Sequence, residues 1–250
     1  MQWLMNEIAI RITHAHLYKY SAEIAAGEAV LFSAILLYRL FKQQERPVLA
    51  IFWILTLGLI VFTWRAFTAN SLEFVHYPQY LPEGMILVAL TLSPVESLAW
   101  VVILGGLDEA YQYTALNWFR PAPYDFNDIY MDLLGGALGV LFGMVFLRCT
   151  RRDQPGPPLW KRPGIVAIFG ILATGVILWA SGLMLLFENK ADTLHWFALS
   201  RFHAPTFWFQ VAANGPNKYH TLSPVEGPLL ILATLAVYAI LDLRVRISAK

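Results

Sequence analysis

Seven stretches of this chain are apolar for long enough to cross a lipid bilayer as helices. Such a helix needs about 20 mostly apolar residues, and the candidates are 22–41, 48–64, 78–92, 95–115, 128–148, 164–187 and 226–243. Of the 250 residues, 58% are hydrophobic and 14% are charged, whereas about a quarter are charged in soluble domains. The sequence therefore predicts an all-α, polytopic transmembrane helix bundle with about seven spans.

Basic residues predict the orientation, because cytoplasmic loops carry an excess of Lys and Arg. Seven spans give one side of the membrane most of the basic residues in short loops: Arg39, Lys42, Arg46, Arg148, Arg151, Arg152, Lys161, Arg162, Arg244, Arg246 and Lys250. We therefore expect the N-terminus outside and the C-terminus in the cytoplasm. Cysteine labelling that placed Ser93 outside and Asn117 inside would contradict this orientation.

The spans group into a front and a rear part. We expect an interfacial segment with the first span at 1–47, a four-helix core at 48–148 and a basic, Pro-rich cytoplasmic linker at 149–163. Two further spans follow at 164–250, joined by the aromatic outer loop 188–225. That loop is suited either to packing in the membrane interface or to docking a partner.

Charge and cysteine content exclude several classes of protein. A net charge of +1 argues against binding nucleic acid, which requires a clustered basic surface. The single cysteine, Cys149, excludes an internal disulfide and a multi-cysteine metal site. We expect no metal and no other cofactor.

The hexapeptide Thr-Leu-Ser-Pro-Val-Glu occurs twice, at 91–96 and at 221–226. A serine followed by proline and then glutamate three positions on is typical of a helix start. The predicted topology puts the copies on opposite faces of the membrane, so they are interpreted as helix starts and not as a duplication.

Polar residues concentrate between 108 and 132. Glu109 and Gln112 are three apart at the end of one span, so they share a helical face. At the start of the next span a stripe at intervals of three or four combines acidic residues with small ones: Asp125, Asp128, Asp132, Gly135, Gly139 and Gly143. Such a glycine stripe lets another helix approach closely, and we expect that helix to be the span at 95–115.

His76 and Tyr80 lie four apart at the start of span 78–92, and Arg120 lies in the loop 116–127. The topology brings them to the same outer end as Glu109 and Asp128. Ionisable groups at membrane depth pair with one another or line a wet cavity. Three interpretations remain open: a structural polar seam, a site for a polar headgroup or an ion, and catalysis by the carboxylates and the histidine.

The motifs at 76–80, 108–112 and 125–128, with Arg120 and the spaced glycines, resemble the VanZ-like family of bacterial membrane proteins. The resemblance covers about 48–148. Glu73 and Asp132 depart from it, standing where the family often has Lys and usually has Asn. It implies a multi-pass protein of the bacterial cytoplasmic (inner) membrane, in a family named after a protein linked to resistance to the glycopeptide antibiotic teicoplanin.

Three functions follow as hypotheses. The leading one is a non-enzymatic protein whose outer polar pocket binds or shields a cell-envelope amphiphile, either a lipid-linked precursor or a glycopeptide. The second is an accessory subunit of a larger membrane protein complex. The third is a membrane hydrolase or transferase acting on a lipid, although no catalytic residue is assigned.

Overall fold

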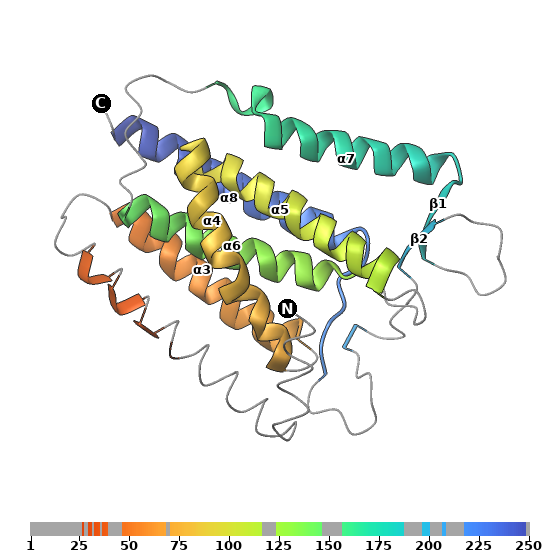
Figure 1. Cartoon of the computed structure of the whole chain (residues 1–250), viewed down its shortest axis with the longest axis horizontal. Helices are drawn as coiled ribbons and strands as arrows, with labels where there is room; N and C mark the ends of the chain where they lie inside the picture. Colours follow the sequence, from red (N-terminus) through yellow and green to blue (C-terminus); the bar gives the residue numbers. More distant parts are fainter. Residues whose placement is uncertain are drawn as a thin grey trace.

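The computed structural model is a bundle of long helices (Figure 1). It describes residues 47–68, 71–116, 124–146, 157–187, 197–200, 207–208 and 218–248, with helical positions at 27, 30–31, 33–35 and 37–39. The helices of the bundle are α3 (Pro47–Ala66), α4 (His76–Thr91), α5 (Pro94–Tyr111), α6 (Phe126–Phe146), α7 (Pro163–Ala180) and α8 (Glu226–Ser248). The all-α prediction is confirmed.

Short elements join these helices. They are the 3₁₀ turns η1 (Ser71–Val75) and η3 (Leu159–Lys161), the π-helical turn η2 (Gln112–Leu116), and the strands β1 (Met184–Phe187) and β2 (Phe197–Ser200). The strands pair in parallel, with Met184 beside Phe197. The predicted span at 164–187 is therefore wrong at its end, because the helix stops at Ala180 and the chain continues as β1.

Within the part of the chain that the structure describes, four helices are long and apolar enough to cross a membrane: α3, α6, α7 and the Glu226–Arg244 part of α8. This finding supports a membrane protein. Helix α4 contains Pro82 and has 16 residues, which is short for a span. Helix α5 carries Glu96, Asp108 and Glu109, and charges of this kind oppose burial in lipid. The seven-span count and the orientation of the termini stay predictions.

Both copies of the repeated hexapeptide begin a helix. The Ser93 side chain accepts a hydrogen bond from the backbone N–H of Glu96 at the start of α5. Before α8, Ser223 and Glu226 bond each other's backbone N–H groups and so form a complete capping box. The copies lie at opposite ends of the bundle, since Ser93 contacts Asp242 near the end of α8.

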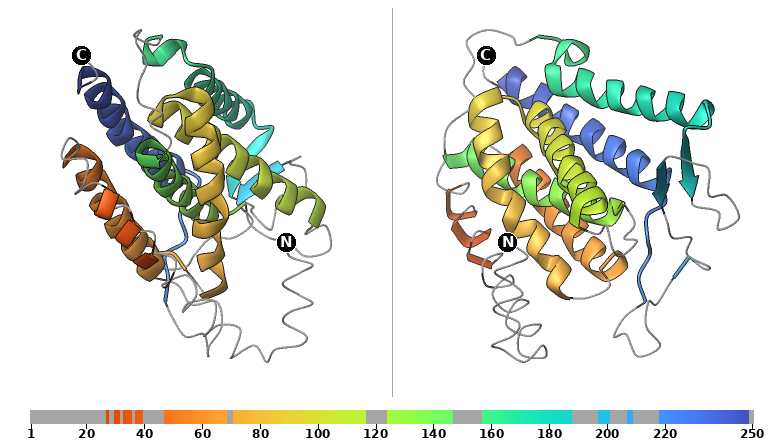
Figure 2. Two further views of the ribbon diagram at one scale, coloured as in Figure 1. Left: turned by 60° about the vertical axis from the view of Figure 1, so that its left-hand side comes forward. Right: turned by 45° about the vertical axis from the view of Figure 1, so that its right-hand side comes forward.

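Helix α6 lies among the other helices at the centre of the bundle (Figure 2). It is buried along nearly its whole length. Its glycine stripe packs on α4: Gly135 lies against the backbone of Tyr77, Gly139 against that of Leu81, and Gly143 against Val88. The expectation that this stripe faces span 95–115 is wrong. Helix α4 reciprocates with Gly84, which lies against the Gly136 carbonyl, so small residues on both helices permit the closest backbone approach.

The rear helices attach to the front of the bundle in different ways. Helix α8 packs on α3 through Tyr238, whose hydroxyl lies 2.6 Å from that of Thr56. Helix α7 is anchored mainly near its start, where the backbone N–H of Gly164 donates to the Glu96 carboxylate over 2.8 Å. Beyond that start most of α7 is exposed. In a membrane this surface faces lipid or another protein.

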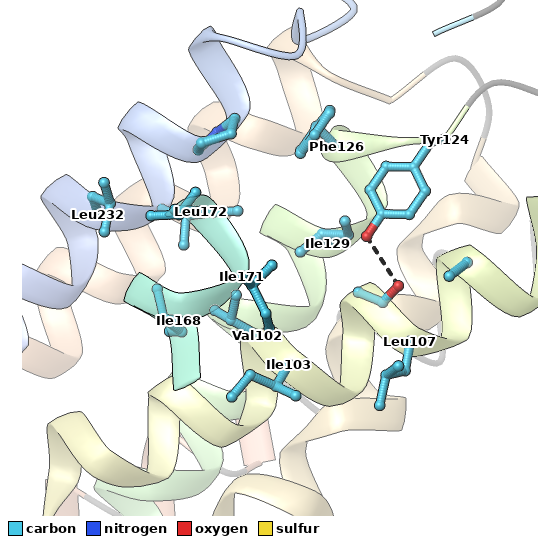
Figure 3. A pocket seen from close by; sticks show the side chains of 14 residues that line it. Val102, Ile103, Leu107, Tyr124, Phe126, Ile129, Ile168, Ile171, Leu172 and Leu232 are labelled. Atoms are coloured by element: carbon cyan, nitrogen blue, oxygen red, sulfur yellow. Dashed lines mark hydrogen bonds between the residues drawn. The ribbon is translucent and has the colours of Figure 1, made fainter. Parts of the chain in front are cut away.

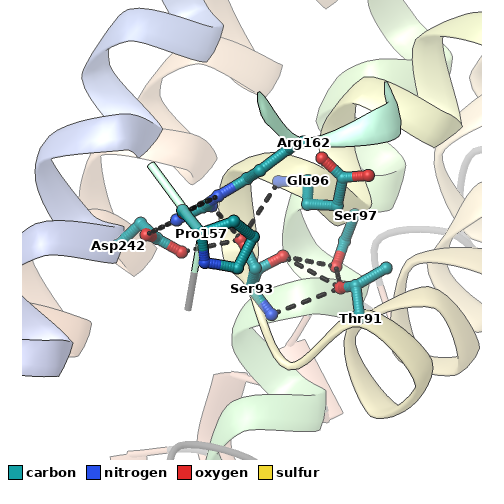
Figure 4. Close-up of polar contacts among 7 residues, drawn as sticks. All are labelled: Thr91, Ser93, Glu96, Ser97, Pro157, Arg162 and Asp242. Carbon is teal, nitrogen blue, oxygen red and sulfur yellow. Dashed lines mark hydrogen bonds and ion pairs between the residues drawn. The ribbon is translucent and has the colours of Figure 1, made fainter. Parts of the chain in front are cut away.

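A buried ion pair joins the front and rear parts at the Ser93 end of the bundle (Figure 4). Arg162 donates to Asp242 over 2.8 Å and also to the Ser93 hydroxyl, and both charged side chains are almost fully enclosed. Ser93 in turn donates to the other Asp242 carboxylate oxygen over 2.8 Å. This network links the residue before α7, the cap of α5 and the last turns of α8.

Candidate functional site

The predicted polar residues that the structure describes lie at one end of the bundle, where α4 and α6 begin and α5 ends. His76, the first residue of α4, lies between two carboxylates of α6. Its Nδ1 is 2.8 Å from Asp132 Oδ1, and its Nε2 is 3.5 Å from Asp128 Oδ2. Asp132 is 1% exposed, whereas Asp128 is 20% exposed, so Asp128 forms the accessible side of this arrangement.

Helix α5 supplies the next part of the cluster. The Gln112 side-chain amide donates to Glu109 over 2.8 Å and to Asp108 over 3.1 Å. Glu109 is buried, and its second oxygen accepts a 3.4 Å hydrogen bond from the backbone N–H of Asp125. Glu109 therefore connects the end of α5 to the segment that leads into α6.

Tyr80 and Glu83 extend the cluster along α4. The Tyr80 hydroxyl is hydrogen bonded to Asp132. Glu83 was missed in the sequence analysis, although it follows His76 by seven residues and therefore shares its helical face. One of its carboxylate oxygens is buried without a hydrogen-bond partner. We call His76, Tyr80, Glu83, Asp108, Glu109, Gln112, Asp125, Asp128 and Asp132 the acidic cluster.

Asn127 is a second residue that the sequence analysis did not select. Its side-chain amide donates to the carbonyls of Phe67 and His220, each over 2.9 Å, and its carbonyl accepts from the backbone N–H of Leu222 over 2.8 Å. These bonds tie the end of α3 and the segment before α8 to α6. Asn127 therefore fixes the start of α6, which carries Asp128 and Asp132 of the acidic cluster, against its neighbours.

Some predicted residues lie outside the part of the chain that the structure describes. Arg120 falls in 117–123, and the interfacial segment 1–20, Cys149 and most of loop 188–225 are likewise outside it. The expected bridge from Arg120 to Glu109 or Asp128 stays a prediction.

The acidic cluster suits proton exchange and polar recognition. An imidazole next to carboxylates can accept and return a proton, and carboxylates accept hydrogen bonds from amines and hydroxyls and coordinate cations. Among the described residues, no group of three or more His, Cys, Asp or Glu side chains is arranged to hold a metal ion.

Asp125 precedes α6 and caps it, accepting from the backbone N–H of Asn127 over 2.8 Å. Burial and the nearby Asp128 carboxylate raise the pKa of Asp125 to about 7, above the unfolded value of about 3.9. A raised carboxyl pKa means that the folded protein holds a proton that the unfolded chain has released. The contribution of Asp125 to stability is therefore present below pH 4 and is lost as the pH rises to 7.

This direction of the pH dependence can be tested with Asp125→Asn, which keeps a good helix cap and removes the titrating carboxyl group. Between pH 5 and pH 7.5 the melting temperature of the wild type should fall more than that of the variant. Thermal unfolding in detergent, followed by circular dichroism at both pH values, measures the difference. Equal shifts in the two proteins would contradict the assignment.

Comparison with known proteins found no match: no family model, no curated protein and no solved structure resembles this chain closely enough to be scored as related.

Proposed function

We propose that this chain is a VanZ-like integral membrane protein whose acidic cluster binds the polar part of a cell-envelope amphiphile, such as a lipid-linked precursor or a glycopeptide. In this proposal it is a multi-pass, non-enzymatic protein of the bacterial cytoplasmic membrane, with the cluster on the outer face. The observation that carries the proposal is His76 held between Asp128 and Asp132 at the shared end of α4, α5 and α6.

The composition of the cluster supports a ligand more than a passive seam. Burying charged groups is costly unless they are paired. Among the described residues of the acidic cluster, the His76 imidazole is the one basic group, and it is outnumbered by the carboxylates of Asp108, Glu109, Asp128 and Asp132. A structural seam would need only a matched pair. An excess of carboxylates favours a ligand that brings amines, hydroxyls or a cation, as polar headgroups and glycopeptides do.

The variant Asp128→Asn tests this proposal, because Asp128 is the accessible carboxylate and the replacement keeps its size. Wild-type protein purified in mild detergent should retain a polyprenyl lipid, a glycolipid or added teicoplanin. The variant should retain roughly tenfold less, as expected when one charge-assisted hydrogen bond is lost. Mass spectrometry of the extracted ligand measures retention.

The matched control is Glu226→Gln, which neutralises a carboxylate at the same end that is 47% exposed. It should leave retention unchanged. Equal retention by Asp128→Asn and the wild type, with both proteins folded, would contradict the proposal.

A second candidate function is that of a subunit in a larger membrane complex. The observation that favours it is the outer surface of α7, where Phe169, Val176 and Trp179 are exposed. Protein partners that co-purify at fixed stoichiometry would support this function.

A further inference from the structure

A separate apolar pocket lies between α5, α6, α7 and α8. Its volume is about 320 Å³, near the lower end of the roughly 300–1,000 Å³ typical of ligand sites. Figure 3 shows side chains from these helices pointing around one space, with Tyr124 at its edge. The lining includes Val102 and Ile103 of α5, Ile129 of α6, Ile171 of α7 and Leu232 of α8.

The packing of the helices on α5 keeps the walls of this pocket apart. Helices α7 and α8 both pack on α5, while α7 is tied down at its start by Gly164 and the preceding Arg162. Its middle, at Ile168–Leu172, faces α8 across the pocket. The pocket opens on the outer surface of the bundle, since its lining residues Leu107 and Ile171 are 60% and 57% exposed. In a bilayer such an apolar space is filled from the lipid phase, because an unfilled space would forfeit dispersion contacts.

The chemistry of the lining restricts that occupant to hydrocarbon. Apart from Tyr124, every lining residue is aliphatic, Pro, Gly or Phe. The Tyr124 hydroxyl is already used, donating to the Gly106 carbonyl over 2.9 Å. Three of the four lining helices, α6, α7 and α8, are long and apolar enough to span a membrane, which places the pocket within reach of lipid chains.

We infer that this pocket binds a single hydrocarbon chain of a membrane lipid. Its volume, at the small end of the range for ligand sites, suits one chain and not a whole two-chain lipid. Tyr124 lies at the end nearest the start of α6, and tyrosines are typical of the headgroup level of a bilayer. The polar end of the lipid therefore lies beside Tyr124, and the chain extends toward Val102 and Ile168.

This site does not depend on the proposed function. The pocket residues Val102, Gly106 and Ala110 lie on one side of α5. Gly105, which packs against Asp132, does not line the pocket. The pocket and the acidic cluster share no lining residue, so a substitution can be made in one and not in the other.

The experiment uses the full chain reconstituted in dioleoylphosphatidylcholine vesicles that contain a lysophosphatidylcholine with a photoreactive diazirine in its acyl chain. Cross-linked peptides are identified by mass spectrometry at increasing probe fractions, with and without an unlabelled lysophosphatidylcholine of the same chain length. We expect saturable labelling of the pocket walls in α5 and α8 that the unlabelled lipid suppresses.

Two variants of α7 provide the matched comparison. Ile171 lines the pocket and is 57% exposed, whereas Val176 does not line it and is 59% exposed. Ile171→Trp fills the pocket and should reduce saturable labelling roughly tenfold, as displacement of about two buried methylene groups would. Val176→Trp should leave labelling unchanged.

Labelling by annular lipid only would overturn the inference. In that case cross-linking would rise linearly with probe fraction, spread over the outer surface of α7, and be equal in both tryptophan variants. Asp128→Asn should keep the saturable labelling, so failure of the lipid-chain site and failure of the proposed function give different results.

Discussion

Arg162→Met is expected to lower the free energy of unfolding by about 3–5 kcal/mol, because it removes the guanidinium that pairs with the buried Asp242 carboxylate. Arg162 and Asp242 are 3% and 1% exposed and 2.8 Å apart. The Ser93 hydroxyl, which donates to the other Asp242 oxygen, carries no charge and cannot replace the guanidinium. Thermal or denaturant unfolding of the detergent-purified protein measures the loss.

Two further variants distinguish the effect on stability of breaking the ion pair from the effect of losing a basic residue. Lys161→Met removes the neighbouring charge, which is exposed, and should change stability by no more than about 0.5 kcal/mol. The double variant Arg162→Met with Asp242→Leu should recover most of the loss, because apolar pairs replace buried ion pairs well. If Lys161→Met were as destabilising as Arg162→Met, the effect would come from the basic linker and not from the buried pair.

The ion pair also shows where the sequence was informative and where it was not. Helix starts at Ser93 and Ser223 were predictable because capping depends on residues three positions apart. Arg162 and Asp242 are 80 residues apart, and Arg162 was interpreted only as a topology signal. In a sequence, a basic residue beside an apolar segment looks the same whether it sets the orientation of a span or forms a buried ion pair. Only the positions of α7 and α8 in the structure distinguish these two roles.

The acidic cluster, too, could be predicted from the sequence only in part. His76, Glu109, Asp128 and Asp132 were selected because alternating helix directions bring their ends together. The partner of the glycine stripe was predicted wrongly, since glycines mark a close approach without naming the helix that approaches. Glu83 could have been found, because an acidic residue seven positions after His76 inside an apolar helix is itself unusual.

The contact between α4 and α6 gives the second large effect. Gly139→Ala is expected to destabilise the protein by about 2–3 kcal/mol, the upper range for overpacking. A Cβ atom at position 139 would overlap the Leu81 carbonyl, and backbone cannot move aside as a side chain can. Unfolding of the purified variant tests this prediction.

Gly170→Ala in α7 is the control, because a Cβ atom there meets nothing within 4 Å. Both substitutions favour helix formation by up to about 1 kcal/mol, so the difference between them isolates the contact with α4. Equal stability of the two alanine variants would contradict the close contact between the backbones of α4 and α6.

The same substitution links packing to the proposed function. Asp132 lies two turns before Gly139 on α6, and its hydrogen-bond partners His76 and Tyr80 belong to α4. Pushing α4 away from α6 should separate these partners and weaken ligand retention in Gly139→Ala, whereas Gly170→Ala retains the ligand. A Gly139→Ala protein that lost stability but kept full retention would show that the cluster binds through α5 and α6 alone, and His76 would then have no part in the site.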